Sequence, residues 1–230
     1  NSGVLHSGIY YGSDTLKAQV CARGAARLMA FAQEYDIACV KSGKVILATE
    51  EKQLATVDRL MRNAEVNGIN AQRIDQKTLR ELEPAAAMGP AAIFCPDTAV
   101  IDSVAVVKRL YELLVQQGVT FYFNSYVQGL ASSPSHYQLK TSKGLISFGF
   151  LFNCAGAYAD TLARHFGLAK DYALLPFKGM YWKLAPYANS LIRSNIYPVP
   201  DINLPFLGVH LTRVISDDVY VGPTAIPVLG

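Results

Sequence analysis

The chain has 230 residues, and 51% of them are hydrophobic. This length and apolar content suffice for a sizeable core, in one large domain or two interleaved ones. The formal net charge is only +3, and the basic residues form no run interleaved with aromatic residues, so we expect no nucleic-acid partner.

Membrane and redox signals in the sequence are weak. No apolar run approaches the roughly 20 residues that a membrane-spanning helix requires, and no signal peptide is recognisable. We therefore expect a cytoplasmic protein with at most peripheral contact with the inner membrane. Four widely spaced cysteines without a CxxC pair are expected to be reduced core residues rather than metal ligands: Cys21, Cys39, Cys95 and Cys154.

The first eleven residues, NSGVLHSGIYY, mix glycines and hydroxyl residues with one histidine, a pattern that neither a packed helix nor a strand needs. Gly3 and Gly8 allow the backbone to approach a flat or phosphorylated ligand, and the hydroxyls of Ser2 and Ser7 add hydrogen-bond donors. The segment is typical of a ligand-contacting loop. An ordinary Ser/Gly loop is the alternative.

The first hundred residues then show two helical patterns and several short strands. Apolar residues recur at helical spacing over residues 13–35 and 50–67. Val- and Ile-rich runs at 37–40 and 44–49 flank a Ser-Gly turn and predict a β-hairpin. Further elements are expected as a strand at 71–74, a short helix at 76–82, and a strand pair at 91–95 and 98–101.

A helix at residues 103–117 opens the middle of the chain, which continues as successive strands at 119–123, 126–131, 137–141 and 145–152. The last of these leads through Ala155-Gly156 into a helix that begins at Ala157. Such a strand-turn-helix brings backbone N–H groups to an anionic ligand at the positive end of the helix dipole. Glycine at this kind of turn also occurs for steric reasons alone.

From residue 173 onward, short strands alternate with proline-rich corners, as in a mixed sheet that roofs a pocket. Five segments now stand out in chain order: NSGVLHSGIYY (1–11), NCAGAYAD (153–160), PFKGMY (176–181), IYPVPD (196–201) and FLGVHLTR (206–213). Together they resemble the FAD-dependent L-2-hydroxyglutarate oxidase/dehydrogenase family, a branch of the D-amino-acid-oxidase-like flavoproteins. The last three segments are much more specific than a glycine pattern.

This resemblance implies an α/β fold in which part of a Rossmann-like FAD-binding domain is interleaved with a mixed-sheet α+β substrate domain. We assign residues 1–35 and 102–170 to the FAD-binding part, and 36–101 and 171–230 to the substrate domain. The implied cofactor contacts are Ser2, Gly3, Ser7, Gly8, Val127, Ala155 and Gly156. Val127 would meet the adenine through its main chain, although its side chain could equally be plain core.

The ends of the chain lead us to expect a fragment. It begins without Met inside a recognisable motif and ends in an apparent loop, whereas the resembled family carries a GxGxxG unit before this motif and another flavin-contacting segment after the last strand. FAD would then be retained incompletely or be absent from the isolated chain. We expect no turnover from the chain by itself.

The resemblance implies oxidation of L-2-hydroxyglutarate, or a similar 2-hydroxy acid, to the 2-oxo acid, with oxygen or a quinone as electron acceptor. Removing hydride from such a substrate requires a base for the hydroxyl proton, and imidazole has a pKa near working pH. His210 is the expected base, and His6 would hydrogen-bond to flavin or substrate. Either residue could instead be a satisfied core histidine.

The remaining candidates are charged or polar groups for an anionic substrate. Lys178 follows an aromatic residue in a predicted strand, where a cation is costly to bury without a negative partner, unless it lies at an exposed strand edge. Arg213 could bind a carboxylate through its fork of donors, or pair with Asp217 or Asp218 at the surface. Tyr197 and Thr212 would complete the substrate pocket.

Two alternative functions stay open at this stage. A related flavoprotein acting on glycerol 3-phosphate or on an amine would share the opening loop and the Ala-Gly turn. A non-catalytic module that holds a partner or a small acid without FAD is the alternative from another class.

Overall fold

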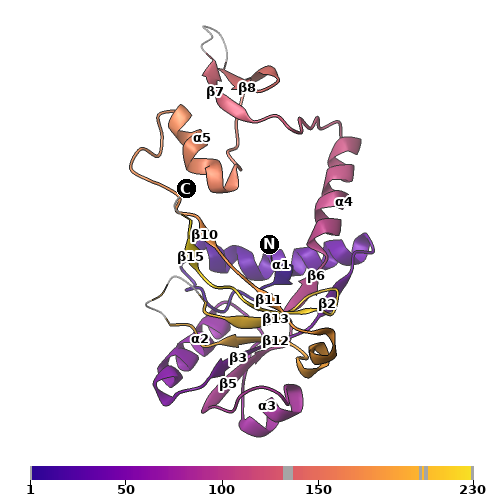
Figure 1. Cartoon of the computed structure of the whole chain (residues 1–230), viewed down its shortest axis with the longest axis vertical. Helices are drawn as coiled ribbons and strands as arrows, with labels where there is room; N and C mark the ends of the chain where they lie inside the picture. The colour runs from indigo at the N-terminus through magenta and orange to yellow at the C-terminus, as the bar shows by residue number, and fades with distance from the viewer. Residues whose placement is uncertain (1, 132–136, 202–203, 205–206, 229–230) are drawn as a thin grey trace. The chain divides into compact units, whose positions relative to one another are not determined.

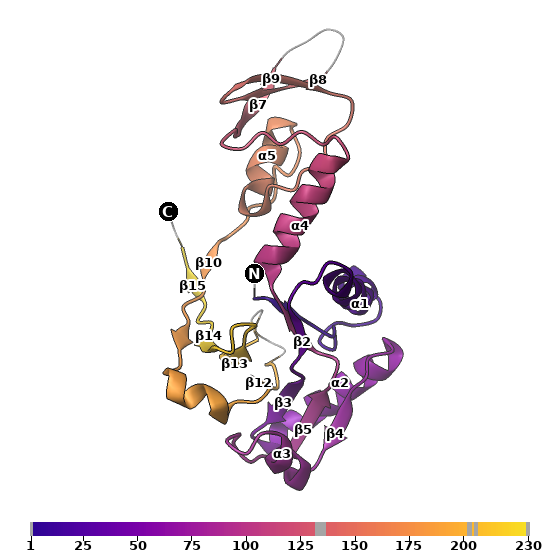
Figure 2. The same cartoon turned by 90° about the vertical axis from the view of Figure 1, so that its right-hand side faces the viewer.

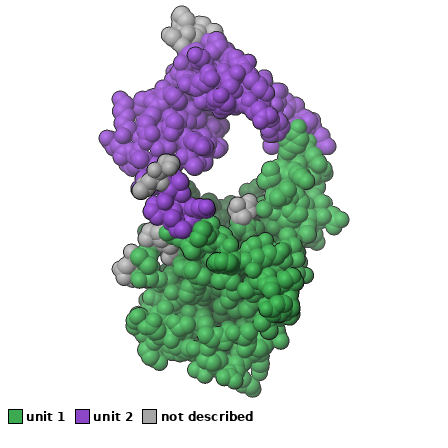
Figure 3. All heavy atoms as spheres, in the orientation of Figure 1, with its two compact units in different colours: residues 1–113, 179–225 green, residues 114–178, 226–230 purple. Residues whose placement is uncertain are grey.

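The computed structural model describes residues 2–131, 137–201, 204 and 207–228. Of the motif residues quoted above, Asn1 and Phe206 lie outside this part. The chain has the expected mixed α/β character and divides into two compact units, which Figure 3 colours separately. Unit 1 comprises Asn1–Leu113 and Gly179–Ala225, and unit 2 comprises Leu114–Lys178 and Ile226–Gly230.

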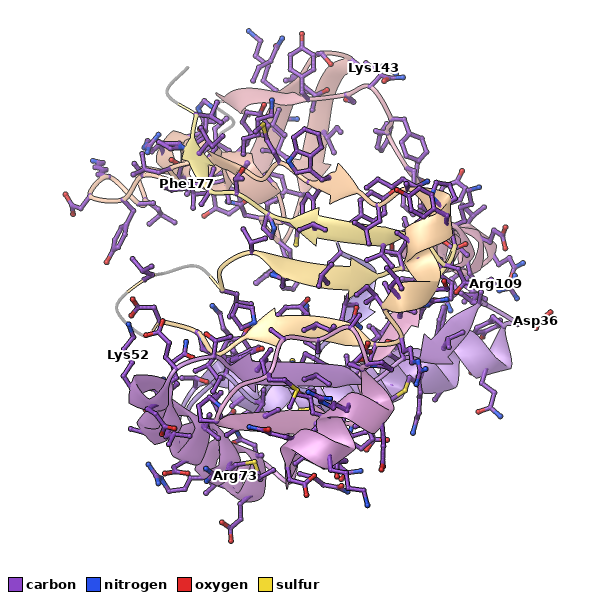
Figure 4. All side chains as sticks on the ribbon, turned by 60° about the horizontal axis from the view of Figure 1, so that its bottom comes forward. Asp36, Lys52, Arg73, Arg109, Lys143 and Phe177 are labelled. Carbon is purple, nitrogen blue, oxygen red and sulfur yellow. The ribbon has the colours of Figure 1, made fainter. Side chains whose placement is uncertain are left out.

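A seven-stranded sheet forms the centre of unit 1 (Figures 1 and 4). Its strands, in spatial order, are β11 (Trp182–Lys183), β14 (Val219–Gly222), β13 (His210–Arg213), β12 (Asn195–Pro198), β3 (Lys44–Ala48), β5 (Ala91–Cys95) and β4 (Gln72–Ile74). All neighbours are antiparallel except β12 and β3, which run parallel with Tyr197 opposite Ile46. The two parts of unit 1 therefore meet at this parallel pair.

Both faces of this sheet are packed. On one face, α2 (Leu54–Val66) buries Val57, Leu60 and Ala64 against Ile46 and Ile93. On the other face, α3 (Gln76–Leu82) buries Leu79 against neighbouring positions of the same strands. All five residues of β3 are buried, because successive side chains of a strand point to opposite faces and both faces are covered.

A three-stranded sheet of β1 (Val4–Leu5), β6 (Ala99–Ile101) and β2 (Cys39–Lys41) completes unit 1. Two helices contribute to its core: α1 (Leu16–Glu34), through Ala32, and α4 (Ser103–Gln116), through Val106. The N-cap of α1 is Thr15, whose hydroxyl accepts from the Ala18 N–H, and Asp102 accepts from the first N–H groups of α4. These helices and α3 confirm the helical predictions for unit 1.

The two predicted strand pairs are wrong, although all four strands exist. β2 pairs with β6, whereas β3 pairs with β5 and β12 in the other sheet. The predicted pair at 91–95 and 98–101 is likewise divided, because β5 and β6 belong to different sheets. Gly43, with a φ of 69°, turns the chain from one sheet into the next instead of closing a hairpin. The Ser-Gly turn in the sequence therefore predicted correctly that the chain changes direction, but it did not predict which strands pair.

Unit 2 contains an antiparallel meander of β7 (Val127–Ala131), β8 (Tyr137–Thr141) and β9 (Gly144–Phe148), beside α5 (Ala159–His165) (Figure 2). The 3₁₀ turn Gly156–Tyr158 precedes α5. A separate two-stranded ladder joins β10 (Phe177–Lys178) to β15 (Ile226–Pro227). The remaining elements, both in unit 1, are the 3₁₀ turns Glu51–Gln53 and Pro186–Leu191.

Two predicted strand segments of unit 2 are not strands. Residues 119–123 and 149–152 belong to none of the sheets in the described part of the chain. Phe150 and Phe152 are 77% and 81% exposed. One cysteine prediction is also wrong: all four cysteines are free and Cys95 is buried, but Cys154 is exposed in the loop after residue 152.

The two compact units do not follow the expected domain boundaries, since they group residues 1–35 with the large sheet. A compact unit need not coincide with a cofactor-binding domain. The assignment of residues 1–35 and 102–170 to an FAD-binding domain therefore stays a prediction. No helix in the described part of the chain is long and apolar enough to span a membrane.

One buried carboxylate connects α3 to the strand that carries Tyr197. Glu83, 1% exposed, accepts hydrogen bonds from the backbone N–H groups of Arg193 and Ser194, just before β12. We expect Glu83→Ala to lower the free energy of unfolding by about 3 kcal/mol, because one buried and one partly buried N–H group lose a charged acceptor. Urea unfolding measures this change.

Glu81→Ala is the matched control. In the described hydrogen bonds, the Arg193 guanidinium donates to the backbone carbonyl of Glu81 and not to its side chain. The substitution retains this carbonyl. The control should therefore stay within about 0.5 kcal/mol of the parent protein. Equal losses in the two variants would contradict the role assigned to Glu83.

Candidate active site

Three aromatic rings from distant parts of unit 1 meet on the α2-covered face of the large sheet. The Tyr197 ring, 1% exposed, lies at the centre. The imidazole of His210 stacks on it with a centroid distance of 3.9 Å and an interplanar angle of 15°. His6 approaches with its ring nearly perpendicular, at 6.2 Å and 88°. We call these three residues the ring cluster.

The strands place two of these rings by register. Ile196 of β12 faces Leu211 of β13, so the neighbouring residues Tyr197 and His210 project together to the opposite face. Thr212, two residues further along β13, projects to the same face, and its side chain hydrogen-bonds to the Tyr197 phenol. Tyr197 and Thr212 were predicted as partners in one pocket, and the structure brings them into direct contact.

Helices α1 and α2 hold the N-terminal loop that carries His6. The Cys21 thiol of α1 donates to the His6 carbonyl at 3.3 Å. From α2, the Asn63 amide donates to the Ile9 carbonyl at 3.3 Å, and the Asn67 amide donates to the Tyr11 carbonyl at 3.0 Å. Sequence reasoning missed both asparagines, since polar residues in an amphipathic helix normally indicate a solvated face.

Gly8 allows the loop to lie this close to α1. Its φ is +89°, and a Cβ atom there would meet Cys21 Cβ at 3.0 Å. A side chain would therefore be strained by backbone conformation and by contact at once. The glycine serves close packing of the loop in unit 1, and its predicted contact with a cofactor stays a prediction.

The pKa values of both imidazoles are lowered, which favours their neutral forms. Burial, together with the nearby charge of Lys44 and the neighbouring His210, lowers the pKa of His6 from 6.5 to about 4. Burial is also the main cause that lowers the pKa of His210, with Lys44 adding to it and the Gly208 carbonyl opposing it. At neutral pH the neutral form of both imidazoles is thus favoured.

The tautomer of His210 follows from its hydrogen bond. Nδ1 lies 2.9 Å from the Gly208 carbonyl oxygen, which can only accept, so we assign the proton of the neutral ring to Nδ1. The Nε2 lone pair is then available to accept a proton. This is the arrangement that a general base requires.

A lysine that sequence reasoning missed lies under the ring cluster. Lys44, the first residue of β3, is 0% exposed, and its Nζ has no hydrogen-bond partner in the described structure. The ammonium lies 4.6 Å from the centroid of the Tyr10 ring and 5.5 Å from that of Tyr197. The available signal was a lysine at the start of the apolar run KVILA, where a cation has no obvious route to solvent.

The other charged candidates lie elsewhere. The Arg213 guanidinium donates to the carbonyls of Asn189 and Ile192 at 3.2 and 2.7 Å and pairs with Asp217 at 2.9 Å. The ion pair with Asp217 that the sequence left open is confirmed. Arg213 projects to the face opposite His210, and its proposed carboxylate-binding role gains no support from these contacts.

Lys178 lies on β10 in unit 2 with an exposed side chain, next to Phe177, which Figure 4 labels. This position matches the exposed-edge alternative. Because Lys178 and the ring cluster belong to different units, its predicted catalytic role stays a prediction.

Candidate cofactor contacts gather in one pocket of each unit. In unit 2, Val127 and Ala155 line a pocket of about 570 Å³ together with Tyr126, Tyr158, Thr161, Leu162 and His165. Gly156 follows directly with a φ of +56°, and a Cβ there would meet no atom within 4 Å. An apolar, aromatic-edged pocket of this size fits a flat heterocycle such as adenine.

In unit 1, Ser2 and Gly3 line a smaller pocket of about 230 Å³ between the N-terminal strand and the helices α1 and α4. Ser7 is half-buried further along the loop, next to His6 in the sequence, and its buried Oγ lies close to the Cys95 thiol. The residues predicted for FAD thus fall into two sets, one in each unit, and their contact with a cofactor stays a prediction.

The depressed pKa of His6 predicts acid sensitivity of the fold. Between its pKa of 6.5 in the unfolded chain and about 4 in the folded protein, the unfolded state binds more protons. The stability linked to His6 is therefore complete above the upper value and is lost toward the lower one, by roughly 3 kcal/mol in total. Urea unfolding at about pH 7 and about pH 4.5 measures the loss.

His6→Asn supplies the comparison, because an amide of similar size cannot titrate in this range. Its unfolding free energy should fall less steeply between the same two pH values, while other titrating groups contribute equally to both proteins. Identical pH dependences for the two proteins would refute the assignment.

Comparison with known proteins matches the sequence of this chain to one family. The sequence model of the FAD dependent oxidoreductase family matches residues 1–228. L-2-hydroxyglutarate dehydrogenase of Escherichia coli K12 is 34% identical over 98% of this chain and 54% of its own length. The human mitochondrial L-2-hydroxyglutarate dehydrogenase is 35% identical over 98% and 51%, respectively. The chain thus spans about half the length of the curated relatives it matches.

Solved structures show the same fold at lower sequence identity. Glycine oxidase from Geobacillus kaustophilus superposes with a TM-score of 0.78 at 20% identity, over 99% of this chain and 61% of that one. L-alpha-glycerophosphate oxidase from Mycoplasma pneumoniae, with FAD bound, gives 0.81 at 22% identity, over 100% and 62%. At these identities the likeness establishes the fold alone.

Proposed function

This chain belongs to the FAD-dependent oxidoreductase family, and on that premise we propose that the protein oxidises L-2-hydroxyglutarate, or a similar 2-hydroxy acid, to the 2-oxo acid. The relatives named L-2-hydroxyglutarate dehydrogenase match 98% of the chain at 34 to 36% identity. The observation that carries the proposal is the ring cluster, in which a neutral His210 presents a free Nε2 beside a buried tyrosine.

Oxidation of a secondary alcohol breaks one C–H bond and one O–H bond and forms a carbonyl. FAD, when bound, supplies the acceptor for the hydride from carbon. His210 Nε2 takes the hydroxyl proton, since its lone pair is free while Nδ1 donates to the Gly208 carbonyl. The lowered pKa of His210 keeps this acceptor unprotonated at neutral pH.

The other residues of the site orient this base. Tyr197 stacks on the His210 ring and is itself held by the side chain of Thr212. His6, edge-on to the same tyrosine, is a neutral hydrogen-bonding group for the substrate or the flavin. We infer that Tyr197 and Thr212 act mainly by holding His210 in place, because both are almost completely buried.

For the cofactor, we infer that the pocket containing Val127 and Ala155 holds the adenine end, with Gly156 close to the phosphates. Ser2, Gly3, Ser7 and Gly8 would contact the flavin half from the N-terminal loop. Each turnover leaves the cofactor with two electrons, which must pass to an acceptor such as oxygen or a quinone. A quinone acceptor would require peripheral contact with a membrane.

Anaerobic reduction of the flavin-loaded protein tests the proposed substrate. L-2-hydroxyglutarate should bleach the flavin absorbance at roughly 450 nm, because it presents both the hydroxyl and the anionic groups that this site would recognise. The D enantiomer should react far more slowly, since its C–H bond would point away when its hydroxyl faces His210.

Glycerol 3-phosphate and glycine are the controls for the other activities known among proteins of this fold. Bleaching by one of them, without bleaching by L-2-hydroxyglutarate, would overturn the substrate assignment. Absence of bound flavin from the purified full-length protein would instead favour a non-catalytic binding module.

His210→Asn tests the base while retaining the local structure, because the asparagine amide can still donate to the Gly208 carbonyl. We expect kcat/KM to fall by about 10² to 10⁴, the usual contribution of general-base catalysis, with little change in KM. Stopped-flow flavin reduction measures the rate, and the flavin content of the variant shows whether cofactor binding persists. A variant with full flavin content and an unchanged reduction rate would exclude His210 as the base.

A further inference from the structure

Lys44 is the most unusual charged residue of the described structure. It is completely buried on β3, and its Nζ has no hydrogen-bond partner in the part of the chain that is described. Burial of an ammonium group without a counter-ion is costly, so such residues are rare unless a function requires them. The mechanism derived above does not use Lys44.

The surroundings of Lys44 contain aromatic rings and thiols. The titratable groups around Lys44 come from the N-terminal loop, α1, β5 and β12: Tyr10, Cys21, Cys95 and Tyr197. Tyr11 and Tyr181 lie further out, beside Tyr10 and Tyr197 respectively. Among these described groups there is no carboxylate. Burial lowers the pKa of Lys44, whereas Cys95 and Cys21 oppose this shift and the faces of Tyr10 and Tyr197 stabilise the ammonium form.

Tyr197 connects the lysine to both histidines. Lys44 lies 5.5 Å from the centroid of this ring, while His210 stacks on the ring at 3.9 Å and His6 meets its edge at 6.2 Å. Register explains the grouping: Lys44 opposes Asn195 across the parallel pair, and Tyr197 follows two residues later on the same face. Lys44 and both imidazoles therefore lie around the same tyrosine ring.

We propose that Lys44 is a positioning residue for proton transfer, whose buried positive charge keeps His6 and His210 unprotonated and so keeps His210 ready to accept the substrate proton. A second and a third cation in this dry cluster would repel the first. The repulsion also helps His210 to release the proton to solvent after each turnover. This inference rests on the proposed function only for the identity of the substrate whose hydroxyl gives up the proton.

The direction of both histidine pKa shifts agrees with this geometry. Lys44 is the largest electrostatic cause that lowers the pKa of His6, after burial. It also lowers the pKa of His210. The aliphatic stem of Lys44 fits an apolar strand, so a neutral side chain of similar length could replace it without creating a cavity.

Lys44→Met removes the charge and retains the volume, and Lys44→Arg retains the charge. The titration of His6 and His210 is followed by NMR through the Cε1–H signals, which is practicable because the chain has only 4 histidines. In Lys44→Met both midpoints should move upward by about one pH unit, since a unit charge at this range acts on that scale. Lys44→Arg should leave them nearly unchanged.

Lys41→Met is the matched control. Lys41 lies three residues earlier on β2, is exposed, and pairs with Asp97 at 2.8 Å. Its removal should leave both histidine midpoints unchanged. Should Lys44→Met fold poorly, Lys44→Gln provides a second neutral variant with a polar end.

Flavin reduction supplies the second measurement. The acid limb of kcat/KM for L-2-hydroxyglutarate should shift to higher pH in Lys44→Met, by the same amount as the His210 midpoint, and should be retained in Lys44→Arg. Unchanged histidine midpoints in folded Lys44→Met would overturn the proposal. A raised KM with unchanged midpoints would also overturn it, because Lys44 would then act by binding the substrate.

The two proposals can fail separately. If L-2-hydroxyglutarate does not reduce the flavin of the parent protein, the substrate assignment fails, but the NMR titration still tests the effect of Lys44. If the flavin is reduced and the midpoints do not respond to Lys44, only the role of the lysine is wrong.

Discussion

Burial of the Tyr197 ring is the constraint on which the site depends. The ring is enclosed by β3, β13 and the N-terminal loop, three segments that are far apart in the chain. Its face accepts the His210 imidazole, its edge meets His6, and the Lys44 ammonium lies within reach of its π-system. A single large side chain thereby sets the positions of the other three, because aromatic and cation–π contacts act only at short range.

The two faces of the large sheet differ in the partners that they offer to a positively charged side chain. Arg213 projects to one face, where three oxygen acceptors from nearby residues satisfy its guanidinium. Lys44 projects to the other face, where no described carboxylate approaches it. The first arrangement stabilises local structure, whereas the second leaves a positive potential beside two neutral imidazoles. A site of this kind favours an anionic ligand and a base that is free at neutral pH.

Sequence reasoning succeeded where the signal was local and failed where it was not. The helix at 76–82 was predicted with the observed bounds, and in the structure Asp75 caps it and Leu79 is its buried residue. The strand pairs around Gly43 and Pro96 were wrong, since each strand pairs with a segment distant in sequence. In the site, His6, Tyr197 and His210 were identified through motif resemblance, while Asn63 and Lys44 were missed because their roles depend on what packs against them.

By itself, the amino-acid sequence determined the alternation of helices and strands, the family and its cofactor class, and the three residues of the ring cluster as site candidates, because periodicity, caps and motifs are properties of short segments. Only the tertiary structure decided which strands pair, that Arg213 serves the loop before β12 and an ion pair with Asp217, and that Lys44 is buried without a partner. These features depend on burial and on contacts between distant segments, and a one-dimensional pattern records neither.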